Sequence, residues 1–280
     1  MDKYFDEKYV KILLPKRPED SHKGTFGHVL NIAGSEFYTG AAYFSSEAPL
    51  RVGCAMVTLA SKESVLKAVS ALTPDVILSP LAKAKENIKS NSYNVVSVGC
   101  GFSLCKKAIK LFDEVIKILN KLSLPVVIDA DGLNILSLLK ISQLPAKTVL
   151  TPHPKELSRL MDTSLDDILL RPEFWARKCC EKYHCTTVLK LHKTLVADDN
   201  GNFYVNSTGN SALSHGGSGD VLTGMISGFL AQGLNCFDAS ILGVYLHGKT
   251  GEIAAKELSE YSVLASDLLN YIPKAIKTIL

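Results

Sequence analysis

The sequence predicts an α/β fold with a central, mostly parallel β-sheet and helices on both of its faces. Short β-branched runs alternate with longer stretches of helical periodicity, and this alternation is typical of parallel strands joined by crossover helices. Several of the runs are continuously apolar, as expected for a sheet that is covered on both faces. The 280 residues contain no linker, repeat or low-complexity block. We therefore expect a single domain over residues 1–280.

The expected strands begin near residue 28 and recur along the first two thirds of the chain. They are His28–Ile32, Ala55–Leu59, Asn94–Val98, Val126–Asp129, Thr148–Leu150 and Val188–Lys190. Apolar residues at spacings of three and four predict helices between these strands. The expected helices are Gly40–Val52, Leu104–Leu122, Pro154–Met161 and Arg171–Tyr183.

A hairpin and the two ends of the chain depart from this alternation. Residues 194–197 and 202–205 are predicted to pair as a β-hairpin, because Asn200-Gly201 supplies the positive φ angles of a tight turn. From Asp220 onward the pattern is mainly helical. Residues 1–20 are expected to be an N-terminal extension that is disordered or loosely docked.

The composition excludes several classes of protein. Hydrophobic residues make up 46% and charged residues 21% of the chain, which is a globular balance. A net charge of +3 is too small and too dispersed to indicate nucleic-acid binding. Seven cysteines without a CxxC pair favour free thiols over a disulfide framework or a zinc ribbon. The charged start of the chain and the lack of a long apolar stretch predict a cytoplasmic protein without a membrane span.

The strongest candidate for a functional site is Gly216-Gly217-Ser218-Gly219-Asp220. Apolar residues at helical spacing follow it, so a glycine-rich turn leads directly into a buried helix. The free N–H groups and the dipole of such a helix start favour phosphate binding. Asp220 stands beside this site, where a carboxylate acts either as a helix cap or as a general base.

Other segments that are rich in glycine or polar residues follow the predicted strands. They include Ala33-Gly34-Ser35, Thr39–Ala42, Gly99–Phe102 and Thr151–Glu156. A tight turn explains each segment alone. Because ligands of parallel sheets bind beyond the carboxyl ends of the strands, together they predict one crevice.

Two further groups of residues leave two interpretations each. Asp129 and Asp131 face the same side if their strand persists, and they either organise Mg²⁺ through water or cap a turn. The loop of Lys190, Leu191, His192, Lys193 and Thr194 either surrounds phosphates or is a solvated charged loop. His247 is interpreted as a packed helix residue.

Taken in order, the motifs resemble the ADP/ATP-dependent NAD(P)H-hydrate dehydratase family of the ribokinase-like superfamily. The resemblance runs from about Lys23 to the C-terminus. It rests on KGTFGHVLNIAGS, the GAA that follows, VIDADGLNIL, TPHPKELSRL, NSTGN with GGSGDVLTGMISGFLAQG, YLHGKTG and ASDLL. The family repairs reduced nicotinamide cofactors that have been hydrated. The resemblance implies that ADP or ATP, with Mg²⁺, phosphorylates the ring hydroxyl, and that loss of phosphate restores NAD(P)H.

The resemblance also implies roles for single residues. Asp220 is the expected general base, and the N–H groups of Gly217 and Gly219 are expected to hold the transferring phosphate, with Gly219 near the nucleotide. Ala41, Gly101 and His153 match positions that contact the hydrate. Lys190 to Thr194 match the loop that contacts the nucleotide.

The resemblance further implies a homo-oligomer, as family members are often tetramers. The 22 residues before Lys23 are too few for the epimerase domain that many relatives carry, so we expect a separate epimerase.

Four positions depart from the usual pattern of the family. Leu191 replaces a usual glycine, GCGFS at 99–103 replaces the usual GPGLG, Lys155 replaces a further glycine, and Ser214-His215 replaces the common Ala-Thr. Two alternatives therefore remain open: a small-molecule kinase of the same superfamily, for a vitamin precursor or sugar alcohol, and a catalytically silent nucleotide-binding protein.

Overall fold

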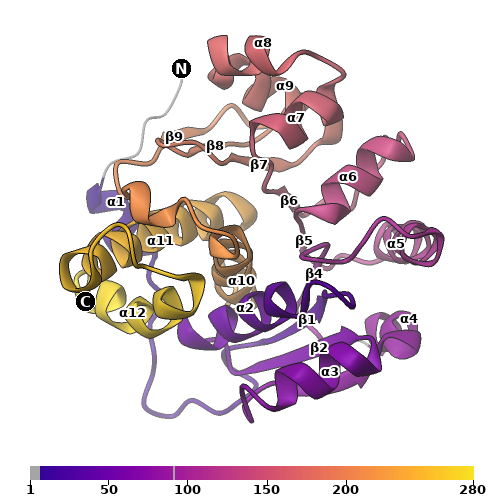
Figure 1. The fold of residues 1–280 in the computed structure, drawn as a ribbon, viewed down its shortest axis with the longest axis horizontal. Coiled ribbons are helices and arrows are strands. Elements are labelled where there is room, and N and C mark those ends of the chain that lie inside the picture. Colours follow the sequence, from indigo (N-terminus) through magenta and orange to yellow (C-terminus); the bar gives the residue numbers. More distant parts are fainter. Residues whose placement is uncertain (1–6, 91) are drawn as a thin grey trace.

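The computed structural model describes residues 7–90 and 92–280, and its centre is a nine-stranded sheet. The strand order is β3-β2-β1-β4-β5-β6-β7-β8-β9. Neighbours from β3 to β7 pair in parallel, whereas β7, β8 and β9 pair antiparallel at one edge. The strands are β1 His28–Ile32, β2 Met56–Ser61, β3 Ile77–Pro80, β4 Val95–Val98, β5 Val126–Ile128, β6 Thr148–Leu150, β7 Thr186–Leu189, β8 Leu195–Ala197 and β9 Phe203–Val205. The prediction of a mostly parallel sheet with an added hairpin is confirmed (Figure 1).

Helices cover both faces of the sheet (Figure 1). They are α1 Glu7–Leu13, α2 Thr39–Arg51, α3 Glu63–Ser70, α4 Ala84–Lys89, α5 Lys106–Leu119, α6 Asp131–Leu138, α7 Pro154–Met161, α8 Leu165–Leu170, α9 Pro172–Tyr183, α10 Ser218–Ala231, α11 Cys236–Leu258 and α12 Ala265–Lys277. The mainly helical C-terminal part is thus as expected. None of the described helices combines the length and the apolar character that crossing a membrane requires.

The strands divide the core into two layers because successive side chains point to opposite faces. Val29 in β1 packs in the layer formed with α2, α10, α11 and α12. Its neighbour Leu30 packs in the layer formed with α5, α6, α7 and α9. Val95 and Val96 in β4 divide in the same way. These β-branched runs are buried on both faces, which is why they read as continuous apolar segments.

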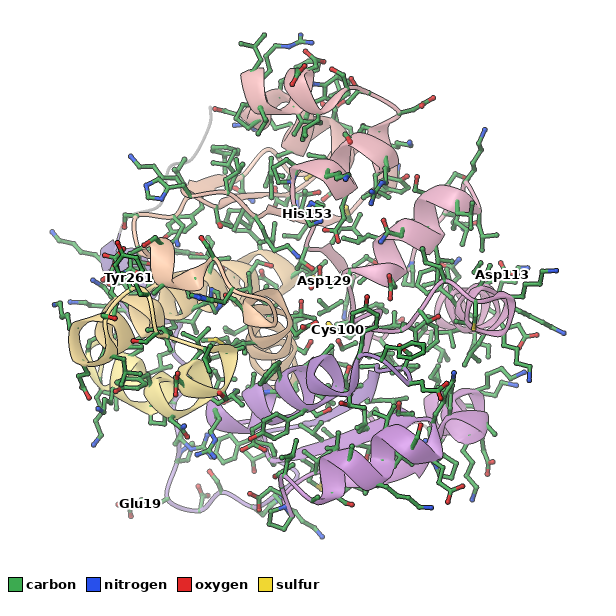
Figure 2. The ribbon with its side chains drawn as sticks, viewed as in Figure 1. Glu19, Cys100, Asp113, Asp129, His153 and Tyr261 are labelled. Atoms are coloured by element: carbon green, nitrogen blue, oxygen red, sulfur yellow. The ribbon has the colours of Figure 1, made fainter. Side chains whose placement is uncertain are left out.

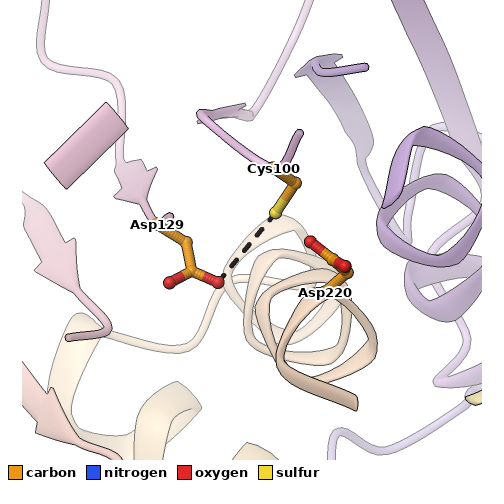
Figure 3. Close-up of side chains that lie close together, drawn as sticks. All are labelled: Cys100, Asp129 and Asp220. Atoms are coloured by element: carbon orange, nitrogen blue, oxygen red, sulfur yellow. Dashed lines mark hydrogen bonds between the residues drawn. The ribbon is translucent and has the colours of Figure 1, made fainter. Parts of the chain in front are cut away.

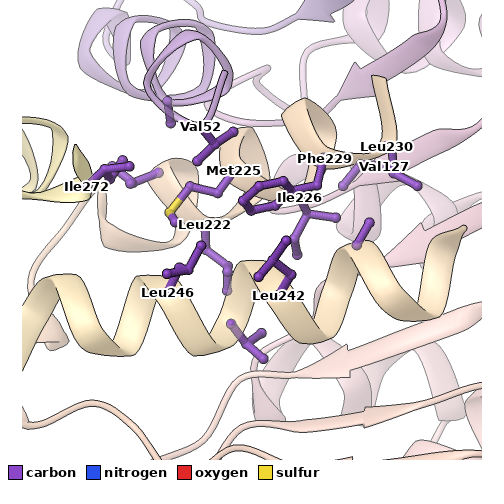
Figure 4. Close-up of a cluster of buried hydrophobic side chains, with 14 of the residues drawn as sticks. Val52, Val127, Leu222, Met225, Ile226, Phe229, Leu230, Leu242, Leu246 and Ile272 are labelled. Carbon is purple, nitrogen blue, oxygen red and sulfur yellow. The ribbon is translucent and has the colours of Figure 1, made fainter. Parts of the chain in front are cut away.

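Close packing of α2 on α10 fixes the position of the glycine-rich helix start. A Cβ atom at Gly224 would lie 2.8 Å from Ala48 Cβ, and one at Gly228 would lie 2.8 Å from Pro49 Cα. Both glycines therefore let the two helices approach closely. On its other sides α10 buries Leu222, Ile226 and further apolar side chains against α11 and the sheet (Figure 4).

Some elements differ from the sequence prediction. The expected loose N-terminal extension is wrong for residues 7–13, because they form α1 with Val10 fully buried and with Tyr9 Oη donating to Asp238 in α11 at 2.7 Å. Residues 1–6 lie outside the described part of the chain. Strand β3 was not expected; its apolar run is short and ends at Ser79-Pro80, and three of its four residues are exposed at the edge of the sheet.

Candidate active site

The carboxyl ends of the parallel strands meet at one edge of the sheet, where α10 also begins. Cys100 follows β4, Asp129 follows β5, and Lys190 follows β7. Asp220 lies in the first turn of α10. Cys100, Asp129 and His153 are labelled near the middle of the molecule in Figure 2. The structure thus brings residues from four predicted segments to one place, as expected for ligand sites of parallel sheets.

Asp129 is the centre of this group of side chains. Its carboxylate is 1% exposed and accepts a hydrogen bond from Lys190 Nζ at 2.6 Å. Its other oxygen accepts from Thr223 Oγ1 at 2.7 Å. Lys190 Nζ also lies 3.9 Å from Glu156 Oε2. Burial opposes the charge of Lys190, but the carboxylates of Asp129 and Glu156 outweigh burial and raise the pKa of the ammonium, so Lys190 stays protonated.

Two carboxyl groups of the cluster have pKa values near neutrality. Burial, followed by the charge of Asp129, raises the pKa of Asp220 to about 6. Burial raises the pKa of Glu156 to about 7 against the opposing charge of Lys190. Burial and the charges of Asp220 and Asp129 keep the pKa of the Cys100 thiol well above its usual value. At pH 7 Asp220 is therefore mostly ionised yet basic enough to accept a proton.

The glycine-rich turn leaves the start of α10 open toward this cluster. Gly217 is the N-cap residue with a φ of +94°, a conformation that favours glycine. A Cβ atom at Gly219 would lie 3.5 Å from Lys190 Nζ and 4.0 Å from Asp129 Oδ2. The free N–H groups of a helix start and a lysine ammonium thus lie together, and this combination binds phosphate.

Ala41, Gly101 and His153 lie around the same edge of the sheet. A Cβ atom at Gly101 would lie 2.8 Å from Ala41 Cβ, so these two residues are direct neighbours. His153 is the N-cap of α7, and its Nδ1 accepts from the N–H of Glu156 at 3.3 Å. Burial, followed by the charge of Lys190, lowers the pKa of His153. The imidazole is therefore neutral at pH 7.

One predicted arrangement is wrong. Asp129 and Asp131 do not share a strand face, because β5 ends at Ile128 and Ala130 turns the chain with a φ of +50°. Asp131 starts α6 and accepts a hydrogen bond from the N–H of Ser103 at 2.7 Å. Asp131 thus holds a turn, and its role toward Mg²⁺ through water stays a prediction.

A cavity of about 440 Å³ adjoins the cluster at Lys190. Leu191, His192 and Thr194 of the predicted nucleotide loop line one wall, whereas Lys193 is exposed outside it. Asn206, residues 208–211 and His247 also line it. Leu191 has no positive φ angle, so the backbone does not require the family's glycine there. His247 is buried and hydrogen-bonds Ser218 Oγ through Nε2 at 3.1 Å, which confirms that it is a packed residue.

A second cavity, of about 450 Å³, lies on the other side of the cluster. It is lined by Phe37, Tyr38, Lys62, Leu104 and Asp131, among others. Phe37 is 87% exposed and Tyr38 is 59% exposed, so two aromatic faces are open to a ligand. A larger cavity of about 670 Å³ opens near the amino ends of β6 and β7, away from the strand ends where ligands of such sheets bind.

Sequence reasoning gave no role to three residues of the cluster. Glu156 was visible as the third residue of a capping box after His153. Thr223 lies one turn after Asp220 and is a polar residue on an otherwise apolar helix. Cys100 was visible only as a departure from the family pattern. Their common signal is a polar residue directly after a strand or on a buried helix face.

The fold and the cluster define a ribokinase-like protein. A ribokinase-like superfamily protein from Enterococcus faecalis has a TM-score of 0.89 at 27% identity, over 99% of this chain and 96% of that chain. Residues 29–274 match the family model of the NAD(P)H-hydrate dehydratases, and the chain belongs to this family.

Two relatives illustrate the match. The chain is 36% identical to the bifunctional NAD(P)H-hydrate repair enzyme Nnr of Coxiella burnetii over 266 residues, which are 93% of this chain and 52% of the relative. It thus spans about half the length of that enzyme. The ADP/ATP-dependent NAD(P)H-hydrate dehydratase of Bacillus subtilis, co-crystallised with ATP/Mg²⁺, has a TM-score of 0.87 at 28% identity and covers 99% of this chain and 98% of its own.

Proposed function

We propose that this chain converts hydrated NADH or NADPH back to the reduced cofactor with ADP or ATP as the phosphate donor. The observation that carries the proposal is the position of Asp220. This carboxylate stands in the open first turn of α10 beside Lys190 and Asp129, in a chain that belongs to the NAD(P)H-hydrate dehydratase family.

Asp220 is the proposed general base. It removes the proton of the ring hydroxyl while that oxygen attacks the terminal phosphate of the nucleotide. The bond from that phosphorus to the bridging oxygen breaks, and the shortened nucleotide leaves. A base with a pKa of about 6 suits this step at neutral pH, and such help contributes about 10²–10⁴-fold to a rate. The bond between the ring carbon and the phosphate oxygen then breaks, and inorganic phosphate leaves as the ring nitrogen supplies its electron pair. Loss of a proton from the adjacent ring carbon to solvent restores the dihydropyridine.

The N–H groups of Gly217 and Gly219 and the ammonium of Lys190 are proposed to hold the transferring phosphate. They are preorganised, because Gly217 caps α10 and Lys190 is fixed by Asp129. Donors held in this way stabilise the charge that develops during transfer without reorganising. A Cβ atom at Gly219 would lie only 3.5 Å from Lys190 Nζ. This short distance supports one phosphate site shared by the helix start and the lysine.

The two cavities on either side of the cluster suit two substrates. We assign the nucleotide to the cavity beside Lys190, Leu191, His192 and Thr194, with Lys193 at its rim as an exposed cation. The hydrate would contact Ala41, Gly101 and His153, and the rest of the dinucleotide would extend into the cavity of Phe37 and Tyr38.

Mg²⁺ is proposed to accompany the nucleotide. The donor set fits this ion, because the oxygens of Asp129 and Asp220 outnumber the single ammonium of Lys190 and Mg²⁺ prefers oxygen ligands and retained water. Asp129, and Asp131 through water, would hold it, and it would neutralise charge on the phosphates. A homotetramer, a cytoplasmic location and a separate epimerase stay predictions.

The proposal is tested by mixing the purified protein with NADH-hydrate or NADPH-hydrate, Mg²⁺ and either ADP or ATP. Recovery of the reduced-nicotinamide absorbance that requires a nucleotide is expected, and it identifies the donor. A product that keeps the phosphate would support the kinase alternative. Nucleotide binding without turnover of either hydrate would support a silent nucleotide-binding protein.

A further inference from the structure

The thiol of Cys100 points into the acidic cluster (Figure 3). Its Sγ lies 4.0 Å from Asp129 Oδ2. One ligand atom from each of Cys100, Asp129 and Asp220 lies within 4.8 Å of the other two. The three residues come from three elements: the loop after β4, the end of β5 and the first turn of α10.

Each of these positions is fixed by the surrounding structure. The carbonyl of Cys100 accepts a hydrogen bond from the N–H of Gly34 at 2.8 Å. Lys190 and Thr223 hold the carboxylate of Asp129. Asp220 is held by the helix in which it lies. Only small side-chain movements are therefore needed to bring the three ligand atoms onto one ion.

The charge around the thiol is a second, independent feature that favours a cation. Asp129, Asp220 and Glu156 supply three carboxyl groups, whereas Lys190 supplies one ammonium, which lies 2.6 Å from Asp129 and 3.9 Å from Glu156. A divalent cation would offset this surplus of acidic groups at a largely buried place.

We propose that Cys100, Asp129 and Asp220 form a binding site for Zn²⁺, a divalent cation that binds sulfur well. In this proposal the bound ion inhibits the proposed dehydratase activity. A sulfur and two carboxylates are three ligands of the kind that Zn²⁺ binds, and a water completes the tetrahedron. Mg²⁺, in contrast, binds oxygen and avoids sulfur. The thiol loses its proton to solvent as the sulfur–zinc bond forms.

Inhibition follows because the ion occupies the carboxylate of Asp220. A carboxylate that ligates Zn²⁺ no longer accepts the proton of a substrate hydroxyl. This part of the inference rests on the proposed function, whereas the binding of the ion does not. The ion enters from the crevice, since Asp220 is partly exposed while Cys100 is fully buried behind it.

Binding is tested with Cd²⁺, whose bond to sulfur gives a charge-transfer absorption in the ultraviolet. The exposed Cys105 is first replaced in a Cys105→Ala background. We expect a saturable absorption at one ion per chain. Mutation of a residue that only supports a metal ligand costs about 10–100-fold in metal affinity. Replacing a ligand itself, as in Cys100→Ser or Asp220→Asn, is therefore expected to weaken binding at least about tenfold. Cys236→Ala, whose thiol is far from the cluster at the start of α11, is the matched control and keeps full affinity.

Zn²⁺ is then added to the turnover assay, and each variant is compared with its own rate in the presence of chelator. The background protein and Cys236→Ala are expected to lose activity reversibly, and Cys100→Ala to require at least tenfold more Zn²⁺. Equal Cd²⁺ absorption, or equal Zn²⁺ sensitivity, in folded Cys100 variants and in the background would overturn the site. Cd²⁺ binding through Cys100 without any turnover would leave the site standing and refute the proposed function instead.

Discussion

The ammonium of Lys190 lies 2.6 Å from Oδ1 of Asp129, although 61 residues separate them in the chain. The two residues follow β7 and β5, which lie on either side of β6 in the sheet. Their contact therefore depends on three strands being in register. It also fixes the lysine beside the start of α10, where the proposed phosphate site lies.

Loss of Lys190 is expected to destabilise the fold. Lys190→Met leaves the buried Asp129 without its counterion, and breaking such a pair costs about 3–5 kcal/mol. Urea unfolding measures this loss. The double variant Lys190→Met/Asp129→Asn is expected to lose less than the single variant, because no buried charge remains. A double variant that loses the sum of the two single effects would contradict the pairing.

Asp220→Asn is expected to stabilise the protein at neutral pH. The pKa of Asp220 is about 6 in the fold, against an ordinary 3.8, so the folded state holds the proton more tightly than the unfolded state. Wild-type stability therefore falls as pH rises from about 4 to 6, by up to about 2–3 kcal/mol. The asparagine variant lacks this loss. Thermal unfolding of both proteins at pH 4 and at pH 7.5 measures this loss of stability. A stability difference between variant and wild type that is equal at both pH values would refute the raised pKa of Asp220.

Two glycines of the same turn are expected to respond differently to alanine. At Gly219 the new Cβ atom would lie 3.5 Å from Lys190 Nζ, an ordinary contact that fills the phosphate site. Gly219→Ala should keep its stability and lose about 10²–10³-fold in kcat. At Gly217, with its φ of +94°, the Cβ atom would lie 2.7 Å from the Phe44 ring. Gly217→Ala should lose stability as well. Equal unfolding midpoints for both variants would contradict this distinction.

Leu191 is expected to affect the nucleotide and not the hydrate. Its side chain lines the cavity assigned to the nucleotide. Leu191→Ala removes apolar contact area and should raise the KM of the nucleotide about tenfold, which corresponds to about 1.4 kcal/mol. Steady-state kinetics with each substrate varied in turn checks this. A change confined to the KM of the hydrate would place the two substrates the other way round.

Much of this arrangement could be predicted because its signals are local. The glycine-rich turn before α10, the strand ends and the Asn200-Gly201 hairpin are each visible within a few residues. Contacts such as Lys190 with Asp129 are not visible, because they depend on the order of strands in the sheet. Asp131 was misplaced because the strand stops one residue before Asp129.

Two short or partly exposed elements were not predicted, for a different reason. Helix α1 is only seven residues long, so it gives little periodicity, and it is held by contacts with α11 through Tyr9. Strand β3 lies at the edge of the sheet and is mostly exposed. Their formation depends on tertiary packing more than on their own sequence.

The most direct test of this account is turnover of NADH-hydrate by Asp220→Asn with the donor nucleotide and Mg²⁺ present. Glu156→Gln is the matched control, because it removes a neighbouring carboxyl group with a raised pKa that is not the proposed base. We predict that the kcat/KM of the wild-type protein rises with pH through about 6 and that Glu156→Gln keeps this rise. Asp220→Asn is predicted to lose at least about 10²-fold in turnover while it still binds the nucleotide. Turnover by folded Asp220→Asn close to the wild-type rate would contradict the central claim.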